Sequence, residues 1–243
     1  MVVYVDDTLM VAAKLPMKLW AELDKNATVK KAAMPICRYL GAHHRLEGLD
    51  SPSGRPRRLS ISMRDYTTKA IEKLISEHGR KLRDVQTQYI QDVEWSVPDD
   101  AQGVFSITCS SHVAALLFLT WVCQPDVSVA VQRLCSAVAA WSTVHDQALI
   151  RLLNSILNLE VVGELTPVGA MDVRIADWNG DASTTKYTNG LFIELSSPSS
   201  GRCWPLAWRS TEQTCSSSST CEAETISLSN GLRSEALPFQ NIL

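Results

Sequence analysis

Two pairs of carboxylates in this chain of 243 residues could carry metal-dependent chemistry, and the first is Asp6-Asp7 near the N-terminus. Neighbouring side chains of a strand point to opposite faces, so adjacent aspartates serve one site only where a tight turn brings them together. The β-prone residues of 1–5 and 8–12 predict a hairpin with the two aspartates at its tip. Carboxylate oxygens held there could ligate Mg²⁺. The alternative is an ordinary acidic turn.

The second pair consists of Asp177, which ends a predicted strand, and Glu224, which lies in the first turns of the last predicted helix. Carboxylates from a strand and a neighbouring helix can converge on a pair of metal ions and support in-line displacement at phosphorus. The alternatives are a strand-end turn for Asp177 and ordinary acidic residues at a helix N-terminus for Glu222 and Glu224.

The other reactive residue types predict no further site. His43 and His44 have no cysteine or carboxylate at ligand spacing, and His112 and His145 fall at helix starts, where surface or hydrogen-bonded histidines are expected. The sequence has no Gly-rich phosphate loop and no Gly-x-Ser-x-Gly elbow. Its seven cysteines are scattered without a Cys-x-x-Cys pair, which disfavours zinc and a disulfide framework and favours a reducing compartment.

Three blocks of predicted elements would position these residues. The first block follows the hairpin with a helix after Pro16, strands near 37–41 and 59–63, and a helix over 65–78. The second block consists of helices over 110–123, 126–141 and 145–160. The third block consists of strands over 172–177, 188–195 and 203–209, followed by a helix from Thr220.

Composition bounds the class of protein. With 45% hydrophobic and 20% charged residues the chain is close to an average globular protein, which excludes wholesale disorder. Its length suits one large domain or two modest ones, at roughly 100–200 residues per domain. The longest apolar stretch, 113–123, falls short of the ~20 residues that span a bilayer. Asp6 and Asp7 interrupt the N-terminal apolar run, so no secretory signal is expected.

The net charge of −3 is unevenly distributed along the chain. Residues 1–95 hold 16 Lys and Arg against 12 Asp and Glu, whereas residues 96–243 hold 7 against 14. The dense basic cluster 55–58 is expected to be a solvated loop. A protein that grips a phosphate backbone usually has a stronger basic bias, so composition alone does not indicate nucleic-acid binding.

Several motifs nevertheless follow one another in an order that a known family shares. They are Tyr4-Val5-Asp6-Asp7, Tyr39-Leu40-Gly41, Gln124-Pro125-Asp126-Val127, Ala176-Asp177-Trp178-x-Gly180-Asp181, Trp208-Arg209-Ser210-x-x-Gln213 and Ser219-Thr220-x-Glu222-Ala223-Glu224. In this order they resemble the Pol polyprotein of Ty1/copia LTR retrotransposons. The first motif resembles the metal-binding hairpin of reverse transcriptases, and the last three resemble the RNase H signature.

The resemblance implies roles, cofactors and partners. Asp6 and Asp7 would be two of three palm carboxylates, and Asp177 and Glu224 would be the first strand aspartate and the helix glutamate of an RNase H site. Each site of the intact family holds two Mg²⁺ ions. The implied partners are an RNA template, an RNA–DNA hybrid and possible flanking Pol segments, without a membrane. The implied location is intracellular, in cytoplasmic virus-like particles or the nucleus, and not secreted.

The resemblance also implies an α+β fold with domain boundaries. Residues 1–84 would be a reverse-transcriptase palm and thumb remnant, 85–108 a linker, 109–165 a helical connection, and 170–243 a partial RNase H-like domain. The parts would be a palm hairpin, the helical connection, and an incomplete β-sheet with one covering helix.

The implied function is RNA-directed DNA polymerisation together with hydrolysis of RNA in RNA–DNA hybrids. Each carboxylate pair supplies two ligands where the family uses at least three, so the chain is expected to be an internal piece of a polyprotein, or a decayed element, and inactive alone. The alternative is a non-catalytic remnant that only folds or binds a partner. A third interpretation is an unrelated helical scaffold in which Asp6-Asp7 is an acidic turn.

Overall fold

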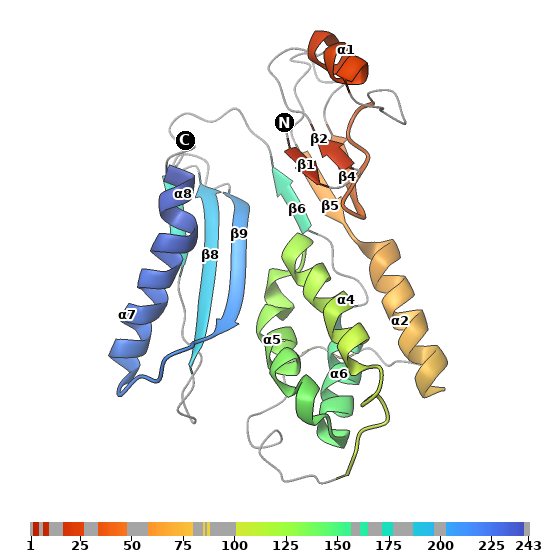
Figure 1. Cartoon of the computed structure of the whole chain (residues 1–243), viewed down its shortest axis with the longest axis vertical. Helices are drawn as coiled ribbons and strands as arrows, with labels where there is room; N and C mark the ends of the chain where they lie inside the picture. The colour runs from red at the N-terminus through yellow and green to blue at the C-terminus, as the bar shows by residue number, and fades with distance from the viewer. Residues whose placement is uncertain are drawn as a thin grey trace.

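The structure, a computed structural model, describes residues 2–4, 7–9, 17–26, 34–47, 58–79, 85, 87, 101–156, 161–164, 172–176, 187–196 and 203–240. Helices and small antiparallel sheets alternate along the chain (Figure 1). This mixed composition confirms the expected α+β class. Among the described helices, none is both long enough and apolar enough to cross a membrane.

A short hairpin begins the chain. Strand β1 (Val2–Tyr4) pairs antiparallel with β2 (Asp7–Leu9), and Tyr4 stands opposite Asp7. The predicted hairpin is therefore present, but Asp7 is the first residue of β2 and takes part in the strand pairing instead of lying at the tip. Helix α1 (Met17–Asn26) follows, where a helix after Pro16 was predicted.

A four-stranded antiparallel sheet comes next, in the order β3-β4-β5-β6. It is formed by β3 (Arg38–Tyr39), β4 (Ala42–Glu47), β5 (Arg58–Ser62) and β6 (Val161–Glu164). Leu40 and Gly41 join β3 to β4 with φ angles of 48° and 77°, the left-handed values of a tight hairpin turn. Helix α2 (Arg64–His78) leaves β5 and ends at Gly79, whose φ of 71° suits a glycine cap.

Three helices form the central bundle: α4 (Cys109–Val122), α5 (Ser128–Ala137) and α6 (Thr143–Ser155). Short 3₁₀ turns, η1 (Pro125–Val127) and η2 (Val138–Ala140), flank α5 and divide the single helix that was predicted over 126–141. Figure 1 shows α4 between α2 and α5. Their buried side chains form one core, which includes Leu74, Phe105, Leu116, Leu119, Leu134, Leu149 and Leu152.

The bundle is tied to the first sheet in a way that the sequence did not reveal. The helix that was predicted to reach residue 160 ends at Ser155, and β6 then pairs with β5. Strand β6 is the fourth strand of a sheet whose other strands lie about 100 residues earlier in the chain. The range 109–165, expected to be wholly helical, therefore contains a strand.

The C-terminal region is a three-stranded antiparallel sheet, β7-β8-β9, with a helix packed on it. Its strands are β7 (Asp172–Ala176), β8 (Thr188–Ser196) and β9 (Cys203–Glu212), all near the predicted positions. Helix α7 (Thr220–Gly231) lies along β8 and continues through a π-helical turn, η3 (Leu232–Ala236), into α8 (Leu237–Gln240) (Figure 1). Small buried residues, Ala223, Ser227 and Gly231, allow this helix to lie close to the sheet.

Candidate functional site

The four carboxylates singled out in the sequence cannot be assembled from the described part of the chain. Asp6 and Asp177 lie outside the described residues, and for Asp7 only the backbone is described. Glu224 is exposed on α7. Within the described residues, no group of three or more His, Cys, Asp or Glu side chains could hold a metal ion. Magnesium binding and the convergence of Asp177 with Glu224 stay predictions.

Glu222 takes the role given by the alternative interpretation, that of an acid at a helix N-terminus. Its carboxylate accepts hydrogen bonds from the backbone N–H of Ser218 at 2.7 Å and from the Ser218 hydroxyl at 2.6 Å. Its own backbone N–H donates to Oγ of Ser219, the N-cap of α7. The hydrogen bonds from the Ser218 side chain and backbone lower the pKa of Glu222. These contacts stabilise the first turn of α7.

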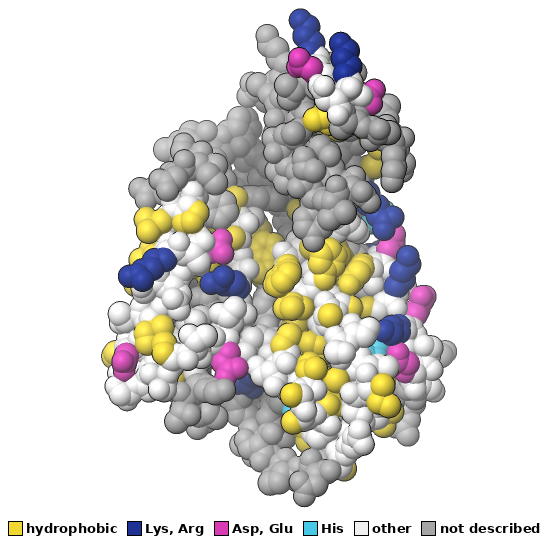
Figure 2. Space-filling model, viewed as in Figure 1, with side chains coloured by type: hydrophobic (Ala, Val, Ile, Leu, Met, Phe, Trp, Pro, Cys, Tyr) yellow, Lys and Arg dark blue, Asp and Glu magenta, His cyan; other side chains and the backbone are white. Residues whose placement is uncertain are grey.

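The most distinctive surface of the described residues lies on α4. Five residues, Ile107, Ser110, Ala114, Leu117 and Trp121, recur in alternating steps of three and four and therefore share one side of the helix and of the turn before it. Trp121 is 65% exposed and Ile107 89% exposed. We call these five residues the α4 outer face. Figure 2 shows hydrophobic side chains gathered over α4 and α5.

The opposite side of α4 is also apolar, because Val113, Leu116 and Leu119 are buried in the core. No Asp, Glu, Lys or Arg occurs between Ala101 and Pro125. A helix that is hydrophobic all round is usually covered on all sides. Exposed apolar side chains that gather on one surface commonly mark an interaction site. The α4 outer face is therefore suited to binding another surface.

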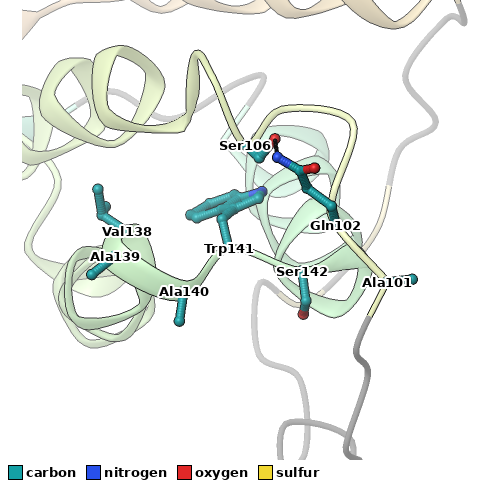
Figure 3. Close-up of a pocket in the computed structure, with 8 residues that line it drawn as sticks. All are labelled: Ala101, Gln102, Ser106, Val138, Ala139, Ala140, Trp141 and Ser142. Atoms are coloured by element: carbon teal, nitrogen blue, oxygen red, sulfur yellow. Dashed lines mark hydrogen bonds between the residues drawn. The ribbon is translucent and has the colours of Figure 1, made fainter.

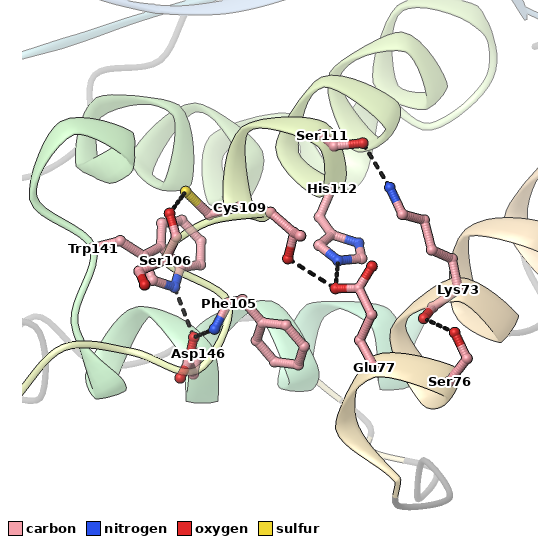
Figure 4. Close-up of polar contacts among 11 residues, drawn as sticks. Lys73, Ser76, Glu77, Phe105, Ser106, Cys109, Ser111, His112, Trp141 and Asp146 are labelled. Carbon is pink, nitrogen blue, oxygen red and sulfur yellow. Dashed lines mark hydrogen bonds and ion pairs between the residues drawn. The ribbon is translucent and has the colours of Figure 1, made fainter.

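Polar contacts with α2 hold one side of α4 in place. Glu77 Oε2 lies 2.8 Å from Nε2 of the buried His112 and accepts a hydrogen bond of 2.8 Å from the Thr108 hydroxyl (Figure 4). Burial acts to raise the pKa of Glu77, but the contacts with His112 and Thr108 outweigh it and lower the pKa. Nearby, Lys73 Nζ donates to the Ser111 hydroxyl at 2.7 Å. His112 is thus a hydrogen-bonded histidine at a helix start, as expected.

A buried aspartate fixes the loop that leads into α4. Asp146 of α6 accepts hydrogen bonds from Trp141 Nε1 at 2.7 Å and from the Phe105 N–H at 3.2 Å (Figure 4). It also accepts one from the Val104 N–H at 2.5 Å. Gly103 packs so closely here that an added Cβ would lie 2.6 Å from a backbone oxygen of Ser142. We call this arrangement the Asp146 clasp. It holds the residues immediately before Ile107.

The C-terminal end of α4 is held by β9. Trp208 Nε1 donates a hydrogen bond to the backbone carbonyl of Thr120, next to Trp121 in the chain. Cys123, directly after the helix, is buried, and burial raises the pKa of its thiol to about 11. Contacts at both ends therefore fix the helix that carries the α4 outer face.

A hollow of about 400 Å³ lies near the start of this helix, lined by Ala101, Gln102, Ser106, Val138, Ala139, Ala140, Trp141 and Ser142 (Figure 3). Some of its polar side chains are engaged within the chain. Gln102 Nε2 donates to the Ser106 hydroxyl at 3.0 Å, and the Trp141 N–H is bonded to Asp146.

The sequence-based search for chemistry missed the α4 outer face because it followed carboxylates. Two signals in the sequence could have found it: the absence of charge from Ala101 to Pro125, and the seven-residue repeat of Ile107, Ala114 and Trp121. Neither signal distinguishes an exposed face from a covered one, which requires the positions of α2 and α5.

Comparison with known proteins gives one informative relationship. No model of a known protein family matches the chain, and no solved structure matches it. The secreted RxLR effector protein 161 of Plasmopara viticola is 32% identical over 123 residues, which amounts to 49% of this chain and 82% of that relative.

This relationship overturns the resemblance to the Pol polyprotein of Ty1/copia retrotransposons, because the relative carries the name of an effector. The assignments as reverse transcriptase, RNase H and transposable element are corrected with it. The motifs behind them each fix only a few residues, and the catalytic roles that they implied lose their support. The relative is named as secreted, which also overturns the expectation of an intracellular protein that is not secreted.

The matching region covers most of the relative, so the kinship does not depend on a short shared motif. The chain belongs to the family of the secreted RxLR effector protein 161 of Plasmopara viticola.

Proposed function

We propose that this chain is a secreted effector that acts without catalysis, by binding another protein through the α4 outer face. The observation that carries the proposal is the exposure of Trp121 on α4 and of Ile107 in the turn before it, in a segment without Asp, Glu, Lys or Arg. A tryptophan is the residue type most enriched among the hot spots of protein interfaces. The interpretation as a non-catalytic binding module, left open by the sequence, is the one that this surface supports.

The geometry of the bundle supports a preformed binding surface. Helix α4 is held by Glu77 on one side, by the Asp146 clasp before it and by Trp208 at its end. A surface fixed in this way loses little conformational entropy when a partner binds, so more of the contact energy appears as affinity.

The proposal of secretion rests on the named relative and is accompanied by a feature of the sequence. The relative's name contains RxLR, which denotes Arg-x-Leu-Arg, and this chain contains Arg80-Lys81-Leu82-Arg83 immediately after Gly79. The tetrapeptide lies outside the described residues. A motif with only three fixed positions occurs often by chance, so the proposal of secretion rests on the relative and not on this tetrapeptide.

Secretion is tested by immunoblotting the culture medium of the organism that encodes the chain, with an intracellular enzyme as the marker of lysis. We expect the chain in the medium without the marker. Detection of the chain in the cell pellet alone would refute the proposal of secretion.

Binding is tested with three purified proteins: the unmodified chain, Trp121→Ser, and Leu228→Ser as a matched control. Leu228 is also an exposed apolar residue, at 46%, but lies on α7. Partners captured from the target tissue are identified by mass spectrometry, produced separately and titrated against each protein. We expect Trp121→Ser to weaken binding by about 30-fold, the factor that corresponds to a hot spot of about 2 kcal/mol. Equal binding by all three proteins would refute the role of the α4 outer face.

A further inference from the structure

Two exposed cysteines flank the turn that joins β9 to α7. Cys215 follows the end of the strand, and Cys221 lies in the first turn of the helix. The residues between them, 216–220, are four serines and a threonine, none of which is large or charged. Figure 1 shows the connection as one short segment between the two elements. The two thiols are therefore accessible to solvent and close to each other in the chain.

Hydrogen bonds close this turn on both sides of the cysteines. The buried Gln213 donates from Nε2 to the backbone carbonyl of Ala223 at 2.8 Å. The Ser217 hydroxyl donates to Oε1 of the same glutamine at 3.3 Å. The Ser218 N–H donates to the carboxylate of Glu222 at 2.7 Å. The end of the strand, the serines and the start of the helix are thus held together.

The two cysteines occupy matching positions within the closed turn. Cys215 is two residues after Gln213, and Cys221 is two residues before Ala223. Two residues span at most about 7 Å, so each cysteine is held close to the hydrogen bond that joins the ends of the turn. A disulfide requires Cα atoms about 4.4–6.8 Å apart. The thiols are unbonded in the structure, and with arms this short a small rearrangement of exposed residues is enough to join them.

The remaining cysteines lie in other parts of the fold. Cys37 is exposed but precedes β3 of the other sheet. Cys203 begins β9, whose 10 residues at about 3.3 Å each place its backbone about 30 Å from the end of the strand that leads to Cys215. Three belong to the central bundle and are buried or half-buried: Cys109, Cys123 and Cys135.

We propose that Cys215 and Cys221 form an intramolecular disulfide in the secreted chain, which fastens the start of α7 to the end of β9. This inference rests on the proposed secretion, because disulfides form and persist in oxidising compartments outside the cytosol. The oxidant is the disulfide of a thiol oxidoreductase on the secretory route. One cysteine thiolate attacks that disulfide, and the second thiolate then displaces the donor from the mixed disulfide. One S–S bond forms in the chain, and the donor's S–S bond is reduced to two thiols, which take up the two protons that the cysteines lose.

The test incubates the purified full chain in mixtures of reduced and oxidised glutathione and then unfolds it in N-ethylmaleimide, which blocks every free thiol. No Lys or Arg lies between Arg209 and Arg233, so trypsin releases both cysteines in one peptide, 210–233. By mass spectrometry we expect this peptide to be two hydrogen atoms lighter than the reduced peptide and to carry neither maleimide nor glutathione. Chain kept under reducing conditions should carry maleimide on both cysteines.

Cys37 provides the internal reference for this experiment, because it is exposed but has no partner thiol in the same turn. At the glutathione mixture that oxidises half of the Cys215–Cys221 pair, we expect less than about a tenth of Cys37 to be oxidised, since a second thiol held nearby acts at a high effective concentration.

Matched variants identify the bond. Cys215→Ser should leave Cys221 open to maleimide or glutathione, and Cys221→Ser should leave Cys215 open in the same way. Cys37→Ser should form the bond as the unmodified chain does. Oxidation should also raise the urea midpoint of the unmodified chain and of Cys37→Ser, but not that of Cys215→Ser, because the bond restricts the unfolded chain.

Several results would overturn the inference. They are maleimide on both cysteines after oxidation, glutathione on either of them in place of the internal bond, or a link from peptide 210–233 to a second copy or to another cysteine. Chain recovered from the culture medium with both thiols free would also overturn it, while the proposed secretion would stand. Chain found only in the cell pellet would overturn secretion, while the glutathione experiment would still decide whether the two cysteines pair.

Discussion

Replacement of Asp146 by alanine should destabilise the whole bundle, because one carboxylate supports the loop before α4 and the tryptophan before α6. Asp146 is buried, and its two oxygens accept hydrogen bonds from the backbone N–H groups of Val104 and Phe105 and from the indole N–H of Trp141. Alanine offers none of these groups an acceptor. The substitution Asp146→Asn keeps one acceptor oxygen and should be milder.

The size of the expected loss in unfolding free energy follows from the burial of the N–H groups that donate to Asp146. Phe105 and Trp141 are buried, so their N–H groups would remain without a partner, whereas the exposed Val104 can bond to water. Each buried donor left unsatisfied costs about 1–3 kcal/mol. Removing a buried carboxylate also relieves its own desolvation, which offsets part of that loss. We therefore expect Asp146→Ala to lower the free energy of unfolding by about 3 kcal/mol, out of the ~5–15 kcal/mol of a typical protein.

Urea unfolding at pH 7, followed by far-ultraviolet circular dichroism, measures this loss. The matched control is Asp65→Ala, which removes an exposed carboxylate 3.0 Å from His43 and should cost less than about 1 kcal/mol. A loss below about 1 kcal/mol for Asp146→Ala, or an equal loss for both variants, would show that the three hydrogen bonds do not stabilise the bundle.

Two further predictions concern protonation. The lowered pKa of Glu77 means that its contacts stabilise the fold above its ordinary value of 4.5, and that this contribution disappears as the pH falls through the lowered pKa. Glu77→Gln should therefore reduce the urea midpoint at pH 7, and this reduction should shrink as the pH is lowered below 4.5; a reduction of the same size at every pH would contradict this. The raised pKa of Cys123, about 11, and its burial predict slow reaction with a disulfide reagent at pH 8, compared with the exposed Cys215. Mass spectrometry of labelled peptides measures the labelling rates of Cys123 and Cys215 in the reduced chain. Labelling of Cys123 in the native chain as rapid as that of Cys215 would contradict the prediction.

Local pattern predicted most of the elements. The alternation at residues 59–63 and the helical spacing at 65–78 correspond to β5 and α2, since both patterns express which side of one element is buried. The helix predicted from Thr220 likewise begins there as α7, where Ser219 accepts the N–H of Glu222. The positions of these elements depend on residues that are close together in the chain, so the sequence alone is enough to predict them.

Contacts between distant segments were not predictable in the same way. Strand β6 pairs with β5 across about 100 residues, and its few residues carry no pattern that names a partner. Asp146 and Glu77 looked like ordinary helix residues, yet Asp146 accepts backbone groups about 40 positions away and Glu77 a histidine 35 positions away. The search for carboxylates selected short motifs such as Asp6-Asp7 and Asp177. The α4 outer face instead belongs to an uncharged stretch that spans a whole helix.

The fold and the proposed binding surface place separate demands on α4. Its inner side is buried in the core, and the polar contacts at Glu77, Asp146 and Trp208 hold it from three sides. Trp121 contributes little to this arrangement, because 65% of its surface remains in contact with solvent. Burial of apolar area is what stabilises a core, so an exposed tryptophan adds a small share of stability and a large tendency to associate. A serine at this position should therefore leave the bundle folded and change only what binds to it, which separates the surface from the scaffold that presents it.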